Sequence, residues 1–322
     1  MKKQVITLVL LVCLLSGCSS SPKALIPYSE GTFKLNNTIS DESAQVADLF
    51  AKELCLIPKD YQETEDASIT SEASLLVDAS TGEVIYADNV YERLYPASIT
   101  KIVTALVTLK YANLSDTVTI SKNAANVTTP GAKLCGFKEG DTIQLEALLN
   151  SLMVYSGNDA GVAIAEHVAG SVEKFSAMMN EEAKKLGAVH SNFVNPHGLH
   201  DENHYTTAYD IYLVFQELIK DERFVKIINQ SSYTAKYKNA SGKDVQAVFP
   251  STNRYLKGTE TSPEGISIFG GKTGTTDKAG SCLVLYSKDS KGDNYISLIL
   301  KAASGNDLFS QMTKLLTKIT NK

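Results

Sequence analysis

The chain has 322 residues, of which 43% are hydrophobic and 21% are charged, which is ordinary for a folded globular protein. This length allows one large domain or two small ones. Lysine and arginine number 31 against 36 aspartates and glutamates, and the net charge of -5, without a basic patch, argues against a nucleic-acid partner.

The first residues predict a secretory leader. Lys2 and Lys3 form a positive start, and residues 5–15 form an apolar run that is short for a membrane span. The run ends in Leu-Ser-Gly before Cys18, which resembles a bacterial lipobox, where the leader is cut before the cysteine and the sulfur carries a diacylglycerol. We therefore expect residues 1–17 to be a lipoprotein signal peptide and Cys18 to be lipidated. An ordinary secretory signal with an incidental cysteine is the alternative.

A stretch rich in serine, asparagine, aspartate and glutamate follows the leader. Residues 18–70, with one amphipathic piece at 44–56, are expected to form a lipidated tether. Two lipid chains on Cys18 would hold the protein at a membrane. We therefore expect it on the extracytoplasmic face of the cytoplasmic membrane, with a single folded domain at residues 71–322.

Three further cysteines, Cys55, Cys135 and Cys282, are far apart and odd in number. Their spacing predicts neither a disulfide framework nor a zinc site. One pair among them has the option of a bridge outside the cell, and the sequence does not say which. Cys282 lies in an apolar run and is expected to be a small buried residue.

The predicted domain begins with a hairpin and a helix. Residues 74–77 and 84–86 are strand-like and flank a turn that contains glycine. A helix is predicted to open at Ser98, because Pro96 cannot continue a helix from before it and apolar residues follow at helical spacing to Leu109.

The middle of the chain reads as helical and its end as strands closed by a helix. A loop-rich section at 115–141 comes first. Apolar residues then recur at helical spacing in four runs, which predict helices at 145–153, 160–168, 172–186 and 207–219. After a polar hairpin at 231–249, strands are predicted at 282–287 and 295–300 and a last helix at 307–319. This order predicts an α+β fold, with an antiparallel sheet from both chain ends flanked by helices and a helical subdomain between them.

Three short motifs stand in order on these elements: Ser98-x-x-Lys101, Ser156-Gly157-Asn158 and Lys272-Thr273-Gly274. Ser98 and Lys101 share one helix face, which places an amine beside a hydroxyl. Each motif alone has an ordinary structural explanation in caps and loops, whereas their joint occurrence in this order argues against it. Asp159, at a helix start where a carboxylate is favoured, is expected to be structural.

Such a set of motifs is known from penicillin-binding proteins and class A β-lactamases. From about residue 70 onward the chain resembles the serine D-alanyl-D-alanine carboxypeptidases, which are low-molecular-mass penicillin-binding proteins of peptidase family S11. The likeness extends to stretches at 75–84, 155–160, 195–199, 204–210 and 272–280. It implies a β-lactamase/DD-peptidase-like fold.

There are two departures from that family. Many relatives carry a small C-terminal β domain and an amphipathic anchoring helix, and we expect neither here, with the N-terminal lipid serving as the anchor. Thr275 stands where some relatives have histidine, which is expected to affect substrate preference while leaving the backbone N–H in place.

The residue types fit the acyl-enzyme chemistry that the resemblance implies. Ser98 would be the nucleophile and Lys101 its base, provided that burial and the cation of Lys272 lower the pKa of the Lys101 amine. Ser156 would relay a proton to the leaving amine. No metal or organic cofactor is expected.

Substrate binding is assigned to Asn158, Lys272, Thr273, Gly274 and Thr275. Asn158 would hold the base and the substrate amide, while Lys272 and Thr273 would bind the terminal carboxylate of the peptide. The N–H groups of Ser98 and Thr275 would form an oxyanion hole.

The resemblance therefore implies an enzyme that removes the terminal D-alanine from peptidoglycan stem pentapeptides, and β-lactam antibiotics that acylate Ser98 as substrate mimics. A serine β-lactamase is one alternative, although residues 192–203 contain Glu202 without a Glu-x-x-Leu-Asn pattern. A zinc peptidase built on the histidines at 197, 200 and 204 is another. A non-catalytic wall-binding lipoprotein is the third.

Overall fold

The computed structural model describes residues 57 and 66–320. The predicted lipidation site Cys18, the cysteine at 55, the amphipathic piece 44–56 and the predicted leader lie outside these residues. The chain divides into two units, Met1–Asp48 and Leu49–Lys322, and every described residue belongs to the second.

An antiparallel sheet is built from both ends of this second unit, as predicted. Its strands stand in the order β2-β1-β9-β8-β7. Their bounds are β1 Ala73–Asp78, β2 Val84–Asp88, β7 Ser267–Thr276, β8 Gly280–Lys288 and β9 Asn294–Ala302. Because β1 pairs with β2 on one side and with β9 on the other, the N-terminal hairpin is held by a C-terminal strand. Strand β7, which carries the third motif, forms an edge of the sheet.

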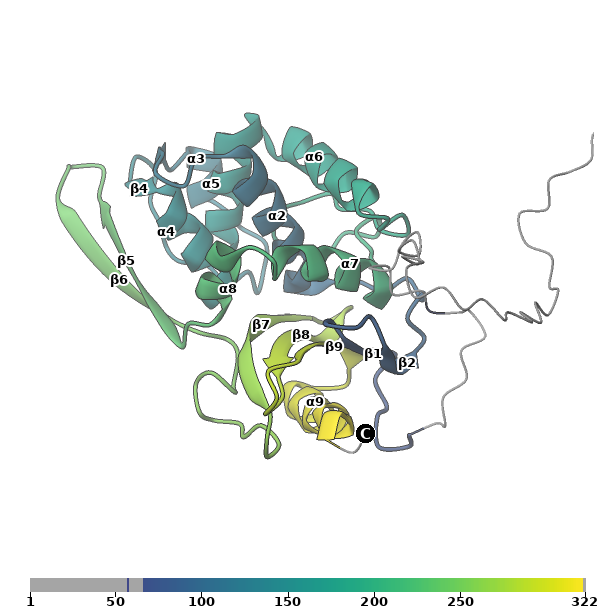
Figure 1. Cartoon of the computed structure of the whole chain (residues 1–322). Helices are drawn as coiled ribbons and strands as arrows, with labels where there is room; N and C mark the ends of the chain where they lie inside the picture. The colour runs from purple at the N-terminus through teal and green to yellow at the C-terminus, as the bar shows by residue number, and fades with distance from the viewer. Residues whose placement is uncertain (1–56, 58–65, 321–322) are drawn as a thin grey trace, which may run out of the picture. The chain divides into compact units, whose positions relative to one another are not determined.

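Helices cover both faces of this sheet (Figure 1). The first turn η1 is a 3₁₀ turn and η2 is a π turn. In chain order the elements are η1 Ala97–Thr100, α2 Lys101–Tyr111, α3 Lys122–Ala125, α4 Leu145–Asn150, η2 Ser151–Tyr155, α5 Asn158–Ala169, α6 Val172–Lys185, α7 Ala208–Leu218, α8 Glu222–Ile228 and α9 Gly305–Thr320. Helices α7 and α8 contact one face, with the other helices beyond them, and α9 contacts the opposite face.

Two hydrophobic clusters follow from this layering. Strand residues alternate between faces, so that Leu75 and Val77 belong to the large cluster with the helical part, while Leu76 belongs to a smaller cluster with α9. All six residues of β1 are buried, which explains why its apolar residues at 75–77 run consecutively without polar alternation.

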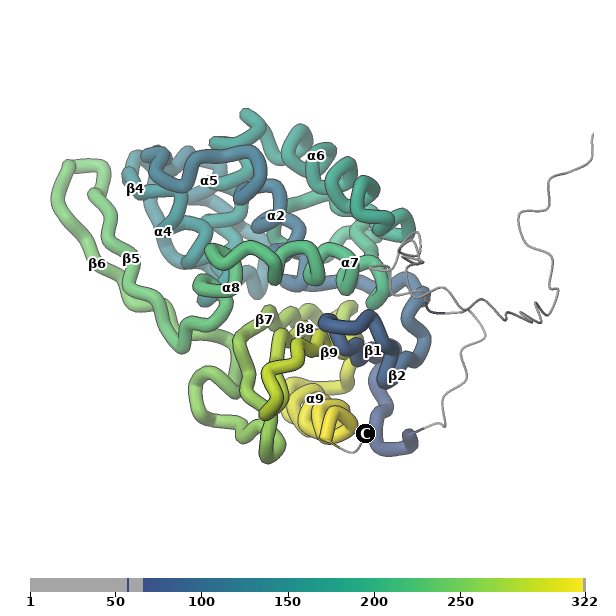
Figure 2. Tube along the Cα trace, in the orientation of Figure 1, coloured from purple at the N-terminus to yellow at the C-terminus, as the bar shows by residue number. Residues whose placement is uncertain are grey.

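A second, four-stranded sheet has the order β3-β4-β5-β6. Its strands are β3 Thr117–Thr119, β4 Thr142–Gln144, β5 Ser232–Lys238 and β6 Asp244–Pro250. The β5–β6 pair is the predicted polar hairpin, and Figure 2 shows it extending away from the helices. Across residues 57 and 66–320, no helix is both long enough and apolar enough to span a membrane.

Three local features differ from the sequence-based expectation. The helix expected at 145–153 is α-helical only to Asn150 and continues as the π turn η2. Helix α8 was not predicted, because seven residues are too few to show a clear apolar period. The pairing of β3 and β4 with the hairpin was not predicted either, since three-residue strands carry little pattern.

Candidate active site

Ser98 lies in a constrained turn between a strand and a helix. It is half-buried as the second residue of the 3₁₀ turn η1, which runs directly into α2, so Ser98 does not cap the α-helix. The preceding Ala97 has a φ of 46°, in a region that costs a residue with a side chain of the order of 1–3 kcal/mol. Such strain persists only where the surrounding structure holds it.

Lys101, one turn later, brings its amine to this hydroxyl. The Nζ of Lys101 lies 2.9 Å from Ser98 Oγ, 2.7 Å from Asn158 Oδ1 and 2.6 Å from the backbone oxygen of His197. The two latter atoms only accept hydrogen bonds. A neutral amine can therefore donate its two N–H groups to Asn158 and His197 and keep its lone pair for the Ser98 hydroxyl proton.

The electrostatic surroundings favour this neutral amine. The Lys101 side chain is fully buried, and burial lowers its pKa well below the ordinary lysine value. The cation of Lys272 lowers it further. Both causes had been expected from the sequence, and their direction is that of a lysine used as a general base.

Ser156 lies at the end of the π turn η2, and its φ of 75° is left-handed. A π turn is rare and is often found at functional sites. Ser156 Oγ accepts a hydrogen bond from Lys272 Nζ at 3.0 Å, and the same amine donates to the backbone oxygen of Thr273 at 2.8 Å. The structure thus brings the second and third motifs into contact.

Strand β7 closes the site. A methyl group built on Gly274 would lie 2.9 Å from the backbone nitrogen of Ser98, so only glycine allows the strand to approach the nucleophile this closely. Thr275 is the next residue on β7, and the oxyanion hole formed by its N–H and that of Ser98 stays a prediction. Thr273 Oγ1 lies 2.6 Å from Thr252 Oγ1 and donates to it. No short motif marks Thr252, and the sequence analysis missed it.

The loop at 192–206 contacts the turn that carries Ser98. His204 is buried; its Nδ1 accepts from the Val194 N–H at 3.1 Å, and its Nε2 lies 2.7 Å from Thr100 Oγ1. Thr100 in turn donates to the Ala97 oxygen at 2.8 Å. Both ring nitrogens of His204 are thus engaged, which contradicts its use as a metal ligand. Across residues 57 and 66–320, no cluster of metal-ligating side chains is found.

Asp159 has the structural role that the sequence predicted. Its buried carboxylate accepts N–H groups from Cys135 at 2.9 Å and Gly136 at 2.8 Å, which ties the loop before β4 to the start of α5. Cys135 and Cys282 are free thiols, and Cys282 is buried as expected.

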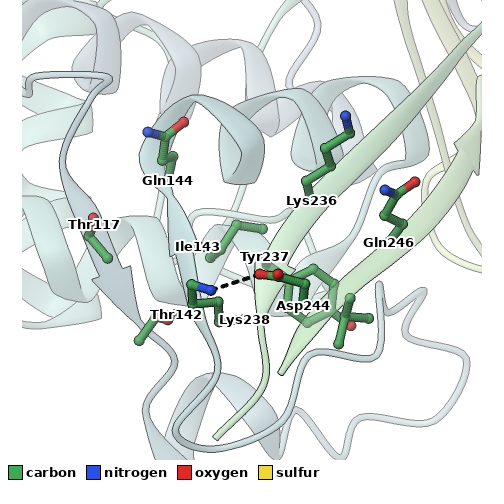
Figure 3. Close-up of a pocket in the computed structure, with 10 residues that line it drawn as sticks. Thr117, Thr142, Ile143, Gln144, Lys236, Tyr237, Lys238, Asp244 and Gln246 are labelled. Atoms are coloured by element: carbon green, nitrogen blue, oxygen red, sulfur yellow. Dashed lines mark hydrogen bonds and ion pairs between the residues drawn. The ribbon is translucent and has the colours of Figure 1, made fainter. Parts of the chain in front are cut away.

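A groove of about 510 Å³ lies elsewhere, between β4 and the β5–β6 hairpin (Figure 3). Polar side chains such as Gln144, Lys236 and Gln246 line it together with Tyr237, and an ion pair joins the strands of the hairpin. None of the three motifs contributes to this groove, and it offers no nucleophile beside a base. The candidate active site is therefore the Ser98 turn.

This combination of an α+β fold with a serine nucleophile beside a buried lysine defines a serine acyl-transfer class. Residues 60–304 match peptidase family S11, described as D-alanyl-D-alanine carboxypeptidase. The chain belongs to this family.

Individual relatives agree with this assignment. The D-alanyl-D-alanine carboxypeptidases DacF of Bacillus subtilis and DacC of Escherichia coli are 33% and 34% identical to it over 80% of the chain. The chain spans 64% and 62% of the lengths of these two relatives.

Solved structures confirm the fold class. The Streptomyces K15 DD-transpeptidase is similar with a TM-score of 0.71 and 28% identity, over 80% of this chain and 98% of that one. Penicillin binding protein 5 from Haemophilus influenzae gives a TM-score of 0.69 and 29% identity, over 80% and 72% of the two chains. The predicted DD-peptidase-like α+β fold is thus confirmed.

Proposed function

We propose that this protein is a serine-type D-alanyl-D-alanine carboxypeptidase that removes the terminal D-alanine from peptidoglycan stem pentapeptides. One observation carries the proposal: the Lys101 amine lies 2.9 Å from Ser98 Oγ while two acceptors occupy its N–H groups. Family membership supports the reaction, and the buried amine supplies its base.

Acylation begins when the Ser98 proton passes to the lone pair of Lys101. The Oγ atom then bonds to the carbonyl carbon of the penultimate D-alanine, and the carbonyl electron pair moves to its oxygen. The N–H groups of Ser98 and Thr275 stabilise that oxyanion; losing one such donor typically costs about 10²–10³-fold in rate. As the C–N bond breaks, the proton that Lys101 took from Ser98 passes through Ser156 to the leaving amine, and D-alanine departs; Ser156 lies beside Lys272.

Hydrolysis of the acyl-enzyme completes the cycle. A water molecule gives a proton to Lys101 and bonds to the carbonyl carbon of the Ser98 ester. The C–Oγ bond then breaks, Ser98 Oγ takes that proton back from Lys101, and the shortened peptide leaves as a carboxylic acid. The terminal carboxylate is bound beforehand by Lys272 and Thr273, and this requirement makes the enzyme an exopeptidase. β-Lactams present a carboxylate beside a reactive amide in the same way, so they acylate Ser98 as substrate mimics.

D-Alanine release from Nα,Nε-diacetyl-Lys-D-Ala-D-Ala tests the proposal. We expect release by the parent protein and none by the Ser98→Ala variant, with chelator making no difference. A folded parent that releases no D-alanine but rapidly hydrolyses a chromogenic cephalosporin would be a β-lactamase instead. Release that survives Ser98→Ala and is lost with chelator would assign the chemistry to the histidine loop.

The same proposal includes a lipid anchor at Cys18 on the extracytoplasmic face of the cytoplasmic membrane. The short apolar run before Leu-Ser-Gly-Cys supports it, because two acyl chains give stable membrane binding where one is marginal. Labelled palmitate fed to expressing bacteria should enter the parent protein and not the Cys18→Ser variant. Equal labelling of both, or of neither, would contradict the anchor.

A further inference from the structure

Lys133 is placed at the rim of the site by two contacts with the Ser156 turn. Its backbone oxygen accepts the Asn158 N–H at 2.8 Å, and its Nζ lies 4.0 Å from the ring centroid of Tyr155, the residue before Ser156. Asp159 clamps the same loop through the next residues of the chain. The Lys133 amine is therefore held beside the catalytic turn while remaining exposed to solvent.

Three lysines reach this turn from three segments of the chain: Lys272 donates to Ser156, Lys101 donates to Asn158, and Lys133 contacts Tyr155. Lys101 and Lys272 are buried, whereas Lys133 is exposed. None of the three forms an ion pair with a carboxylate of the described residues. Asp159 acts on Lys101 electrostatically, but backbone N–H groups bind its carboxylate.

The mutual repulsion of these cations lowers their pKa values. Burial and then the charge of Lys133 lower the pKa of Lys272 to about 7. Burial and then Lys257 lower the pKa of Lys133 itself. In a chain with a net charge of -5, a group of like charges without counter-ions is a place where a bound anion would relieve repulsion.

We propose that Lys133 binds a carboxylate of the substrate upstream of the scissile bond, so that the enzyme prefers acidic stem peptides to their amidated forms. This inference rests on the proposed function, in which Lys272 and Thr273 bind the terminal carboxylate. Lys133 lies in a different segment from β7 and contacts the Ser156 turn through Tyr155 and Asn158. We therefore assign it to a second carboxylate of the substrate, distinct from the terminal carboxylate that Lys272 and Thr273 bind.

Two peptides that differ in one group test this preference. Both are γ-D-glutamyl-(Nε-acetyl-Lys)-D-Ala-D-Ala; the α-carboxyl of the glutamyl residue is free in one and amidated in the other. Each keeps the terminal carboxylate. We expect Lys133→Gln to lower the ratio of kcat/KM for the free acid to that for the amide roughly two- to fivefold, as for loss of a partly exposed charge pair, with the loss in KM. Because Lys133 also acts on Lys272, a change common to both peptides is expected and cancels in this ratio.

Two variants serve as controls. Lys133→Arg keeps the cation and its place on the Tyr155 ring, and should keep the preference for the free acid. Lys138→Gln removes an exposed lysine from the same loop and should change neither peptide. Equal loss for both peptides in Lys133→Gln, or no loss for either, would overturn the inference.

Binding to the Ser98→Ala variant separates this inference from the proposed function. Calorimetric Kd values for the two peptides need no turnover, and the free acid should bind more tightly only while Lys133 is present. Discrimination in binding without D-alanine release by the parent would reject the carboxypeptidase and keep the carboxylate site. D-Alanine release by the parent, with equal Kd values for the two peptides, would keep the carboxypeptidase and reject the carboxylate site.

Discussion

The two buried lysines of the site differ in their neighbours. Lys101 faces two fixed acceptors and one hydroxyl, an arrangement that suits a neutral amine with its lone pair toward Ser98. Lys272 donates to Ser156 and to a backbone oxygen, and its pKa of about 7 leaves it partly charged near neutral pH. One amine is thus suited to accept a proton and the other to bind an anion.

Replacing Lys101 tests its role as the base. Arginine is always charged and cannot release its proton in a protein, and methionine has no basic group at all. We expect acylation of Ser98 by a fluorescent penicillin to fall about 10²–10⁴-fold in both Lys101→Arg and Lys101→Met, the usual contribution of general-base catalysis. Lys138→Arg, on an exposed lysine, serves as the control. A parental acylation rate in either folded Lys101 variant would mean that another group takes the proton.

Lys272 predicts a pH dependence of substrate binding. A lysine whose pKa is lowered to about 7 is a cation below that pH and loses its charge above it. The pH dependence of kcat/KM reports the pKa values of groups in the free enzyme. Since Lys272 loses the charge that binds the terminal carboxylate, kcat/KM for D-alanine release should fall as pH rises through about 7, mainly because KM rises. In Lys272→Arg the side chain stays charged, so this alkaline limb should disappear in the pH profile. An unchanged limb in that variant would assign the titration to another group.

At the scale of elements, the loop at 192–206 determines where η1 can lie. Gly198 has a φ of 84°, and a methyl group built on it would lie 1.8 Å from the Ala97 oxygen. His204 reaches the same turn through Thr100. The strained Ala97 conformation is therefore held by a loop about a hundred residues away in the chain.

The variant Gly198→Ala should displace the turn that carries Ser98. Gly170→Ala is a matched control, because Gly170 also has a positive φ, of 80°, but has no atom within 4 Å of a built methyl group. Both pay the left-handed cost of about 1–2 kcal/mol. Gly198→Ala should lose further stability in thermal melts and lower penicillin acylation at least about tenfold, since small misplacements of reacting groups are costly. Equal behaviour of the two variants would show that the loop does not position η1.

Element by element, the sequence predicted most of what local patterns can encode. Apolar spacing located α5, α6, α7 and α9, and residue types in order located all three motifs. The π turn, helix α8, and the contacts of Thr252, His204 and Lys133 were not predicted. The two helical turns are too short to show a clear apolar period, and the contacts join residues distant in the chain: Thr100 and His204 are 104 residues apart, and no local period records such a contact.

At the scale of the whole molecule, the sheet separates the active site from the C-terminal helix. The Ser98 turn and the helical part lie on one face, and α9 packs on the other (Figure 1). Strand β1 contributes side chains to both hydrophobic clusters, so neither cluster is complete until β1 pairs with the C-terminal strand β9. Stability should therefore depend on both faces, whereas the chemistry depends directly on one.

Truncating a core residue of α9 tests this separation. Met312 is fully buried in the smaller cluster, and its replacement by alanine removes packing worth about 2–5 kcal/mol. For a domain of this size that corresponds to a decrease in Tm of roughly 5–15 °C. Because Met312 packs on the face opposite Ser98, the acylation rate per folded molecule should stay within about twofold of the parent when it is measured well below Tm.

Ser310→Ala, at an exposed position of the same helix, should leave both Tm and rate nearly unchanged. A Met312→Ala protein that stays folded but loses acylation would show that the sheet transmits the disturbance from one face to the other.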